Sequence, residues 1–137
     1  MTTLRTFVDN LEAVTITGVT RQYTQGPPAG APGTADLPAS YVRLPKLSEG
    51  PIVLSGQGGW PELSATLVIL MEPVAQNLQG VNFDATVTMI DNVSTAFGAV
   101  ACGILGMAKP SWNCAQTIDS VAGIDFWAVM VSVEGRG

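Results

Sequence analysis

The sequence predicts an α+β domain: a mostly antiparallel sheet with one long helix across a face, a short N-terminal helix and a long Pro/Gly-rich arm. Three observations predict this class. Apolar and polar residues alternate along Leu63–Met71, as in a central strand. Apolar residues recur at helical spacing from Phe83 onward. No strand–helix–strand repeat is present. The chain has 137 residues, which suits one domain spanning residues 1–137.

The first 24 residues predict one helix and one strand. Leu4, Phe7 and Leu11 recur at helical spacing, which predicts a short amphipathic helix over residues 3–12. Alternation of the following residues predicts a strand at residues 19–24.

Residues 24–45 are predicted to form an extended arm, because this segment holds five of the nine prolines. Proline fixes φ and removes a backbone donor, which excludes a helix or a central strand here. A long loop of this kind in a small domain is usually functional, so we expect it to reach a neighbouring subunit. The apolar groups expected to anchor it on a partner are Tyr23, Leu37, Tyr41 and Leu44.

The rest of the chain is predicted to alternate between strands and one long helix. Pro73 ends the central strand, and the helix begins between Asn77 and Asn82 and ends at about Gly106. Phe83, Val87, Ile90, Phe97, Ala101 and Ile104 form its apolar stripe. The further strands expected are 41–47, 51–57, 111–121 and 124–133, the last two joined as a hairpin by Ala122-Gly123 and followed by a mobile polar tail.

Composition argues against several functions. The net charge is −5 and the six basic residues are scattered, which disfavours sequence-independent binding to nucleic acid. The chain has no histidine, the commonest general base and metal ligand, and only two cysteines. The glycines of SGQGGW match no nucleotide-binding motif. We therefore expect no enzyme activity, no metal and no cofactor.

The sequence also bears on compartment. The N-terminus is too polar for an export signal, and no disulfide framework is expected. The longest apolar run, residues 93–108, is short and interrupted by glycine, so no membrane span is predicted. A reducing cytoplasm during synthesis is the simplest expectation.

Two minor alternatives remain open at this stage. Exposed tryptophan can stack on sugars, so Trp60, Trp112 and Trp127 allow a small sugar-binding module. Asp119 and Asp125 flank the predicted hairpin turn and could form an acid–base pair of an enzyme, although two solvated turn residues are the simpler reading.

Four segments together resemble the tail terminator (tail completion) proteins of long-tailed bacteriophages. They are TGVTRQYTQGPP, TADLPASYVRLP, GGWPELSATLVILMEPVAQN and FWAVMVSVEG. The resemblance covers residues 4–135, and it lies in the order of the predicted elements and in these short sequence segments. It implies a structural virion protein that forms a hexameric ring at the head-proximal end of the tail tube. A head–tail joining protein of the phage neck is the alternative in the same setting.

The resemblance also implies partners. Such a ring stops polymerisation of the major tail-tube protein and joins the tube to a head-completion (stopper) protein, first in the host cytoplasm and then in the virion. DNA would pass through the lumen without specific binding, because an acidic lumen repels it. The acidic residues that we expect to supply lumen-facing charge are Asp36, Glu49, Glu62, Asp119 and Asp125. Sheet edges or the hairpin are expected to meet the neighbouring subunits.

Overall fold

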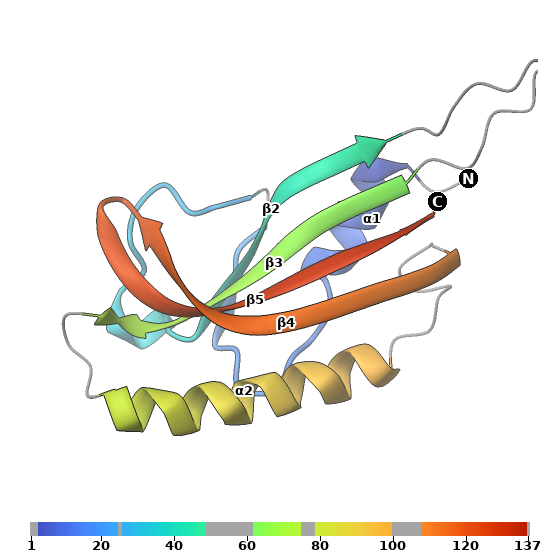
Figure 1. Ribbon diagram of the computed structural model, residues 1–137. Helices are drawn as coiled ribbons and strands as arrows, with labels where there is room; N and C mark the ends of the chain where they lie inside the picture. The colour runs from blue at the N-terminus through green and yellow to red at the C-terminus, as the bar shows by residue number, and fades with distance from the viewer. Residues whose placement is uncertain (1–2, 25, 49–61, 75–78, 100–107, 137) are drawn as a thin grey trace, which may run out of the picture.

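The computed structural model describes residues 3–24, 26–48, 62–74, 79–99 and 108–136. In these ranges it has an α+β fold with a five-stranded sheet and two α-helices (Figure 1). The helices are α1 (Leu4–Glu12) and α2 (Gln79–Ala99), and η1 (Thr34–Asp36) is a single 3₁₀ turn. The strands are β1 (Arg21–Gln22), β2 (Ala39–Ser48), β3 (Glu62–Pro73), β4 (Ala108–Val121) and β5 (Ile124–Arg136).

The sheet is mixed, and its strand order is β1-β2-β3-β5-β4. Strand β1 runs parallel to β2, and all other neighbouring pairs are antiparallel. The register shows in one row across the sheet: Tyr41 of β2 is paired with Val68 of β3, Val68 with Met130 of β5, and Met130 with Ala115 of β4. The predicted α+β class is therefore confirmed, and one parallel pair is added at the β1 edge.

Local chemistry explains the ends of two elements. The Thr3 hydroxyl caps α1 by accepting a hydrogen bond from the backbone N–H of Thr6 at 3.1 Å. At the β4–β5 turn, Ala122 and Gly123 have φ values of 51° and 81°. Two positive φ values are what a tight hairpin turn requires, so the predicted two-residue hairpin is confirmed.

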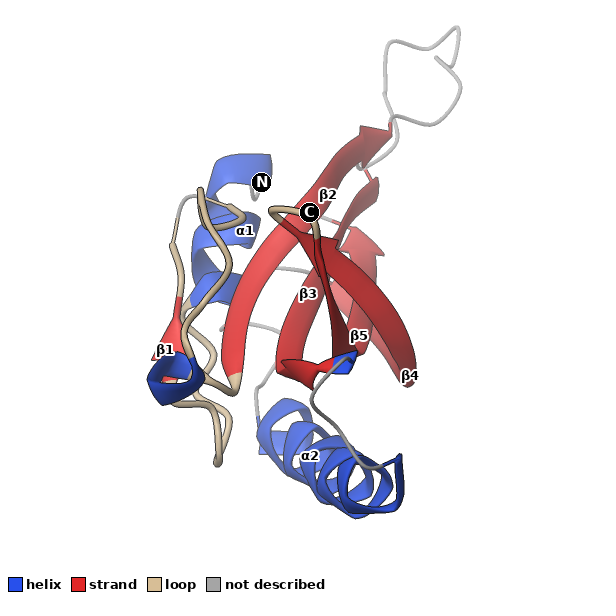
Figure 2. Ribbon diagram, turned by 90° about the vertical axis from the view of Figure 1, so that its left-hand side faces the viewer, coloured by secondary structure: helices blue, strands red, loops and turns tan. Residues whose placement is uncertain are grey.

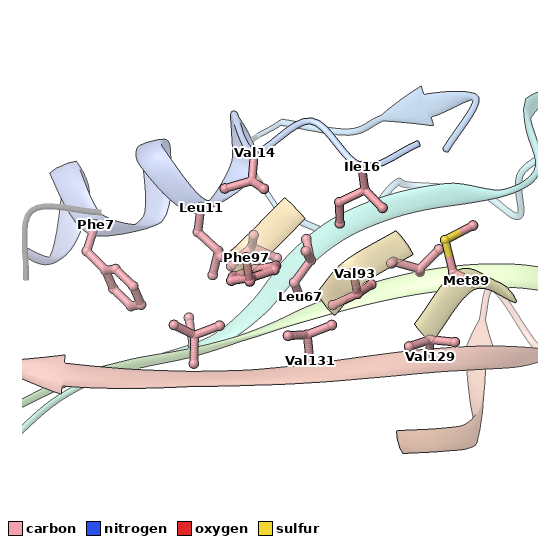
Figure 3. Packing of buried hydrophobic residues seen from close by; sticks show 14 of the residues in the cluster. Phe7, Leu11, Val14, Ile16, Leu67, Met89, Val93, Phe97, Val129 and Val131 are labelled. Carbon is pink, nitrogen blue, oxygen red and sulfur yellow. The ribbon is translucent and has the colours of Figure 1, made fainter. Parts of the chain in front are cut away.

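One face of the sheet carries the main core, and both helices pack against it. Helix α1 contributes Phe7 and Leu11, and α2 contributes Met89, Val93 and Phe97 (Figure 3). These side chains meet the inward-facing residues of the central strands, which include Leu63, Leu67, Val129, Val131 and Val133. The fully buried side chains at this interface supply most of the apolar burial that stabilises the domain.

The opposite face of the sheet holds a smaller core at the hairpin end. Its buried members are Tyr41, Val68, Leu70, Val121, Phe126 and Ala128. Tyr23, Ala31 and Leu37 pack against this cluster, so the proline-rich segment lies on its own sheet. Figure 2 shows β1 and the loops beside it at the β2 edge of the molecule. We predicted that this arm reaches a neighbouring subunit. For Tyr23, Ala31 and Leu37 that prediction is corrected, because they pack on their own subunit.

The arm also ends earlier than predicted, because β2 begins at Ala39 and includes Pro45. A strand accommodates proline where ladder pairing is already interrupted. The register between β2 and β3 shifts between Arg43 and Lys46, and Leu44 has a φ of 53°. This β-bulge places Pro45 where no ladder donor is needed.

Other element boundaries differ from prediction. Strand β1 has two residues instead of six. Residues 134–136, predicted to be a mobile tail, belong to β5 because Glu62 and Leu63 of β3 pair with Arg136 and Gly135. Helix α2 begins inside its predicted window. The predicted strand at 51–57 and the predicted helix end near residue 106 lie outside the described residues.

Candidate functional site

Asp119 forms a buried polar cluster with Tyr41 and Arg43. The Tyr41 hydroxyl donates a hydrogen bond to Oδ2 of Asp119. Nη1 of Arg43 donates to the other carboxylate oxygen, Oδ1, at 2.6 Å. The Asp119 side chain is only 6% exposed, and that of Arg43 is 31% exposed. Both carboxylate oxygens are therefore occupied by donors within the subunit.

The cluster changes the ionisation of Tyr41. Burial raises the pKa of Tyr41 above its usual value, and the hydrogen bond to Asp119 and the negative charge of that carboxylate raise it further. The nearby Arg43 acts in the opposite direction with a smaller effect. Tyr41 is therefore a neutral hydrogen-bond donor, and it is buried in the subunit's own core.

The acid–base pair considered from the sequence does not form. Asp119 lies opposite Phe126 in the β4–β5 ladder, whereas Asp125 lies opposite Ser120, one residue further along. Successive side chains of a strand point to opposite faces of the sheet, so the two carboxylates lie on different faces. Asp125 is exposed and accepts a hydrogen bond from the Ser120 hydroxyl.

Of the five residues expected in an acidic lumen, the four that the structure describes do not form one surface. Asp119 is buried against Arg43 and cannot line a channel, which corrects that prediction. Asp125 lies at the hairpin end of the sheet, and Glu62 begins β3 at the other end, opposite Arg136. Asp36 is half-buried in η1, and Glu49 lies outside the described residues.

Three of the four predicted arm anchors serve the subunit's own core. Tyr41 is fully buried, and Tyr23 and Leu37 pack against the same cluster. The reason is that β2 pairs with β3 from Ala39 onward, which places Tyr41 opposite Val68 inside the sheet. Leu44 is the one member of the four with an exposed side chain, which is 64% exposed at the bulge.

A second exposed apolar surface lies on α2, and the sequence prediction missed it. The predicted stripe placed Phe83 and Val87 against the sheet, but Phe83 is 60% exposed and Val87 is also exposed. The buried face instead consists of Thr86, Met89, Val93 and Phe97. Both stripes have helical spacing, so periodicity alone could not choose between them.

Three contacts set the rotation of α2. The Gln116 side chain of β4 donates to the Thr86 hydroxyl at 3.4 Å, and the rings of Phe97 and Trp112 have centroids 5.6 Å apart. On the other flank, Asn92 donates to the backbone carbonyl of Thr17 at 2.9 Å. These contacts direct Phe83 and Val87 away from the core.

Strand β4 forms one edge of the sheet, and among the described residues no strand pairs with its outer side. Natural edge strands are usually protected by lysine, proline or a bulge. Strand β4 has these features at its first end, where Lys109 and Pro110 lie at a register shift between Ala108 and Ser111. The rest of the strand, residues 111–121, contains no proline and no lysine, and its only charged residue, Asp119, is turned toward Arg43. Trp112 and Ile118 are exposed along this strand. The β4 edge is therefore suited to pairing with another chain.

A groove of about 510 Å³ lies on the half of the sheet farthest from the hairpin. Its side chains come from all four long strands and are mostly polar: Lys46, Ser64, Thr66, Ser111, Asn113, Ser132 and Glu134. Trp112 also borders the groove, but its ring makes a tilted contact with Phe97, a residue of the opposite face. The aromatic platform that a sugar site needs is therefore engaged elsewhere.

Within the described ranges, no three acidic, histidine or cysteine side chains come together in a way that could hold a metal ion. Cys114 is a half-buried free thiol, and burial raises its pKa. Cys102 lies outside the described residues. Neither described helix has the length and apolar character needed to cross a membrane.

Comparison with known proteins does not assign the chain to a family. No protein-family model matches the sequence, and no curated protein matches it.

Proposed function

We propose that this chain is a structural virion protein that forms a ring at the head-proximal end of a phage tail tube. There it stops tube polymerisation and provides the joint to the head. The observation that carries the proposal, together with the sequence resemblance, is the β4 edge, which is open along residues 111–121. An open sheet edge is a ready site for pairing with another chain, and a heterologous contact between identical subunits can close a ring.

The proposed partners follow from this role. The ring contacts the last layer of the major tail-tube protein on one side and a head-completion (stopper) protein on the other. DNA passes through the lumen without specific binding, which the net charge of −5 favours. Asp36, Glu49, Glu62 and Asp125 remain candidates for lumen-facing charge. No catalysis is required of such a subunit.

A head–tail joining protein of the neck is the alternative role, because the same open edge could complete a connector ring. A sugar-binding module has weaker support, since the Trp112 ring packs on Phe97.

The test measures native mass by light scattering after size exclusion, with and without purified tail-tube subunits of long-tailed phages. A terminator should cap tubes and halt their growth at substoichiometric amounts. A chain that forms rings but does not affect tube growth would support the neck alternative. A monomer that is indifferent to tubes would contradict both roles.

A matched pair of variants tests the β4 edge directly. Ile118→Lys places a charge on the edge strand, and we expect it to abolish assembly and tube capping. Ile124→Lys is the control, because Ile124 has nearly the same exposure but lies beside the hairpin turn, where it pairs with Val121 of the same hairpin. If both variants behave like the wild type, the edge has no part in assembly.

A further inference from the structure

We propose that two copies of the free chain pair through their β4 edges about a twofold axis, so that β4 of each copy continues the sheet of the other. The occupant of the edge is a second copy, and the contact is antiparallel strand pairing. This inference goes beyond the proposed ring, because it describes the chain before it meets a tube. A ring contact is heterologous and competes with this pair for the same edge.

The hairpin decides which backbone groups of β4 are open. In a two-residue hairpin the residues that flank the turn, here Val121 and Ile124, exchange backbone hydrogen bonds. Every second residue back from Val121 therefore bonds to β5. The residues between them direct their N–H and C=O groups outward, and these are Trp112, Cys114, Gln116, Ile118 and Ser120. All except the half-buried Cys114 are exposed, so another strand has access to the edge.

Exposed apolar side chains lie beside this edge, on the face that α2 covers. The two contacts between α2 and β4 show that the helix runs antiparallel to the strand, which can be followed in Figure 1. Phe83 precedes the contact residue Thr86 by three positions, so it lies on the β4 flank of α2, toward Ile118. Both Phe83 and Ile118 are exposed. A strand added to the edge covers Ile118 from the side.

The opposite edge of the sheet is obstructed, which makes β4 the regular open edge among the described residues. From Ser111 to Val121 the register with β5 has no shift. At the other side, β1 pairs with β2 at Ala39 and Ser40, and beyond them β2 carries the bulge that contains Pro45. Bulges and prolines block the addition of a strand. The edge of a second copy that matches β4 is therefore its own β4, and such a contact is isologous.

The register of the pair follows from the same geometry. In an antiparallel pair, full overlap of residues 111–121 with the same residues of the second copy puts Gln116 on the twofold axis. Gln116 is one of the outward-directed residues, so these residues bond to one another across the axis, as an antiparallel ladder requires. Ile118 then lies opposite Cys114 of the second copy, and this pairing gives an exposed apolar side chain a neighbour of similar character.

Side chains on the other face of the pair are also compatible. Ala115 lies opposite Thr117 of the second copy, and both side chains are short. Asp119 is the one charged residue of the segment, and it lies opposite the neutral Asn113. Like charges directly opposite each other destabilise a ladder, and this register brings none together within residues 111–121. The lysine and the proline at the start of β4 stay outside the overlap.

Cysteine cross-linking tests both the pairing and its register. Ala115→Cys and Thr117→Cys are made separately in a Cys102→Ser/Cys114→Ser background and then mixed under mild oxidation. Opposite residues of a non-hydrogen-bonded pair have Cα atoms about 4.5 Å apart, which suits a disulfide. Within either variant alone the two cysteines are diagonal neighbours about 7–8 Å apart, beyond the reach of an unstrained disulfide. We expect the mixture to form several-fold more cross-linked dimer than either variant alone.

A mixture of Asn113→Cys and Thr117→Cys is the register control, because these two positions are also diagonal neighbours and should cross-link no more than either variant alone. Circular dichroism checks that each variant folds. Light scattering of the wild type without tubes should give the mass of a dimer. The proposal is overturned if the free wild type is not a dimer, or if the control mixture cross-links as well as the mixture of Ala115→Cys and Thr117→Cys.

The cross-linked dimer also separates this inference from the proposed function. Its two β4 edges occupy each other, so we expect it to leave tube growth unchanged, and reduction of the disulfide should restore capping. A pair that forms in this register but caps no tubes after reduction would sustain the pairing and reject the tail role. Capping by a chain that never pairs would reject the pairing and sustain the tail role.

Discussion

Tyr41 of β2 donates a hydrogen bond to Asp119 of β4, although β3 and β5 lie between these two strands in the sheet. Residues separated by three strand spacings in a flat sheet would be about 14 Å apart. The contact therefore requires the β4–β5 hairpin to curl over the β2 side, and Figure 1 shows this curl. Arg43 binds the same carboxylate, so the cluster holds the curled sheet closed.

Replacing Asp119 should destabilise the fold. Asp119→Asn leaves Arg43 without its partner charge, and we expect a loss of roughly 3 kcal/mol in the free energy of unfolding. This is the low end for a buried pair, because Arg43 is partly exposed. Urea denaturation measures the change. Asp125→Asn, at an exposed position, should stay within about 0.5 kcal/mol of the wild type. Equal effects in the two variants would show that the cluster does not stabilise the sheet.

Stability should fall at alkaline pH because of Tyr41. Its pKa is raised in the folded state, so above the ordinary tyrosine pKa of about 10 the unfolded chain loses this proton while the folded chain keeps it. The contribution of Tyr41 is therefore complete below about pH 10 and is lost as the pH rises further.

Urea unfolding between pH 9 and 11 measures this loss. Tyr41→Phe should be less stable at pH 9 by about 1–2 kcal/mol, because the hydrogen bond to Asp119 is missing, but its stability should fall less with pH. Tyr23→Phe serves as the comparison and should keep the wild-type pH dependence. If the free energy of unfolding falls equally with pH in the wild type and in Tyr41→Phe, Tyr41 is not the cause of the alkaline loss of stability.

Shortening the proline-rich segment should affect the fold itself. Deleting residues 27–34 removes Ala31, which packs against the core cluster containing Tyr41 and Phe126. The sequence alone predicts that this deletion weakens only assembly. From the packing we expect a lower thermal midpoint of the monomer as well, measured by circular dichroism. An unchanged thermal midpoint would show that the segment does not stabilise its own subunit, and it would favour a role in assembly alone.

Cys114 should react slowly in the folded protein. Burial raises the pKa of its thiol, and the thiolate is the reactive form. In a Cys102→Ser background, a disulfide reagent at pH 8 should modify Cys114 several-fold more slowly than it modifies the urea-unfolded chain. Equal rates would show that the thiol is more accessible than its packing beside the main core indicates.

Local patterns in the sequence determined much of the fold. The spacing of Leu4, Phe7 and Leu11 was enough to predict α1, and alternation was enough to predict β3. The two-residue hairpin also followed from local chemistry, because Ala122-Gly123 can adopt the positive φ values that its turn requires. These features depend on neighbours in the chain, which a sequence displays directly.

Tertiary structure alone decided the surfaces. Whether Phe83 or Met89 faces the sheet depends on contacts with Thr17 and Gln116, which are distant in sequence. Asp119 is buried because the curl of the sheet brings Arg43 to it from 76 residues away. Helical and strand periods show that a face exists, but only packing between remote segments decides which face is covered and which is left for a partner.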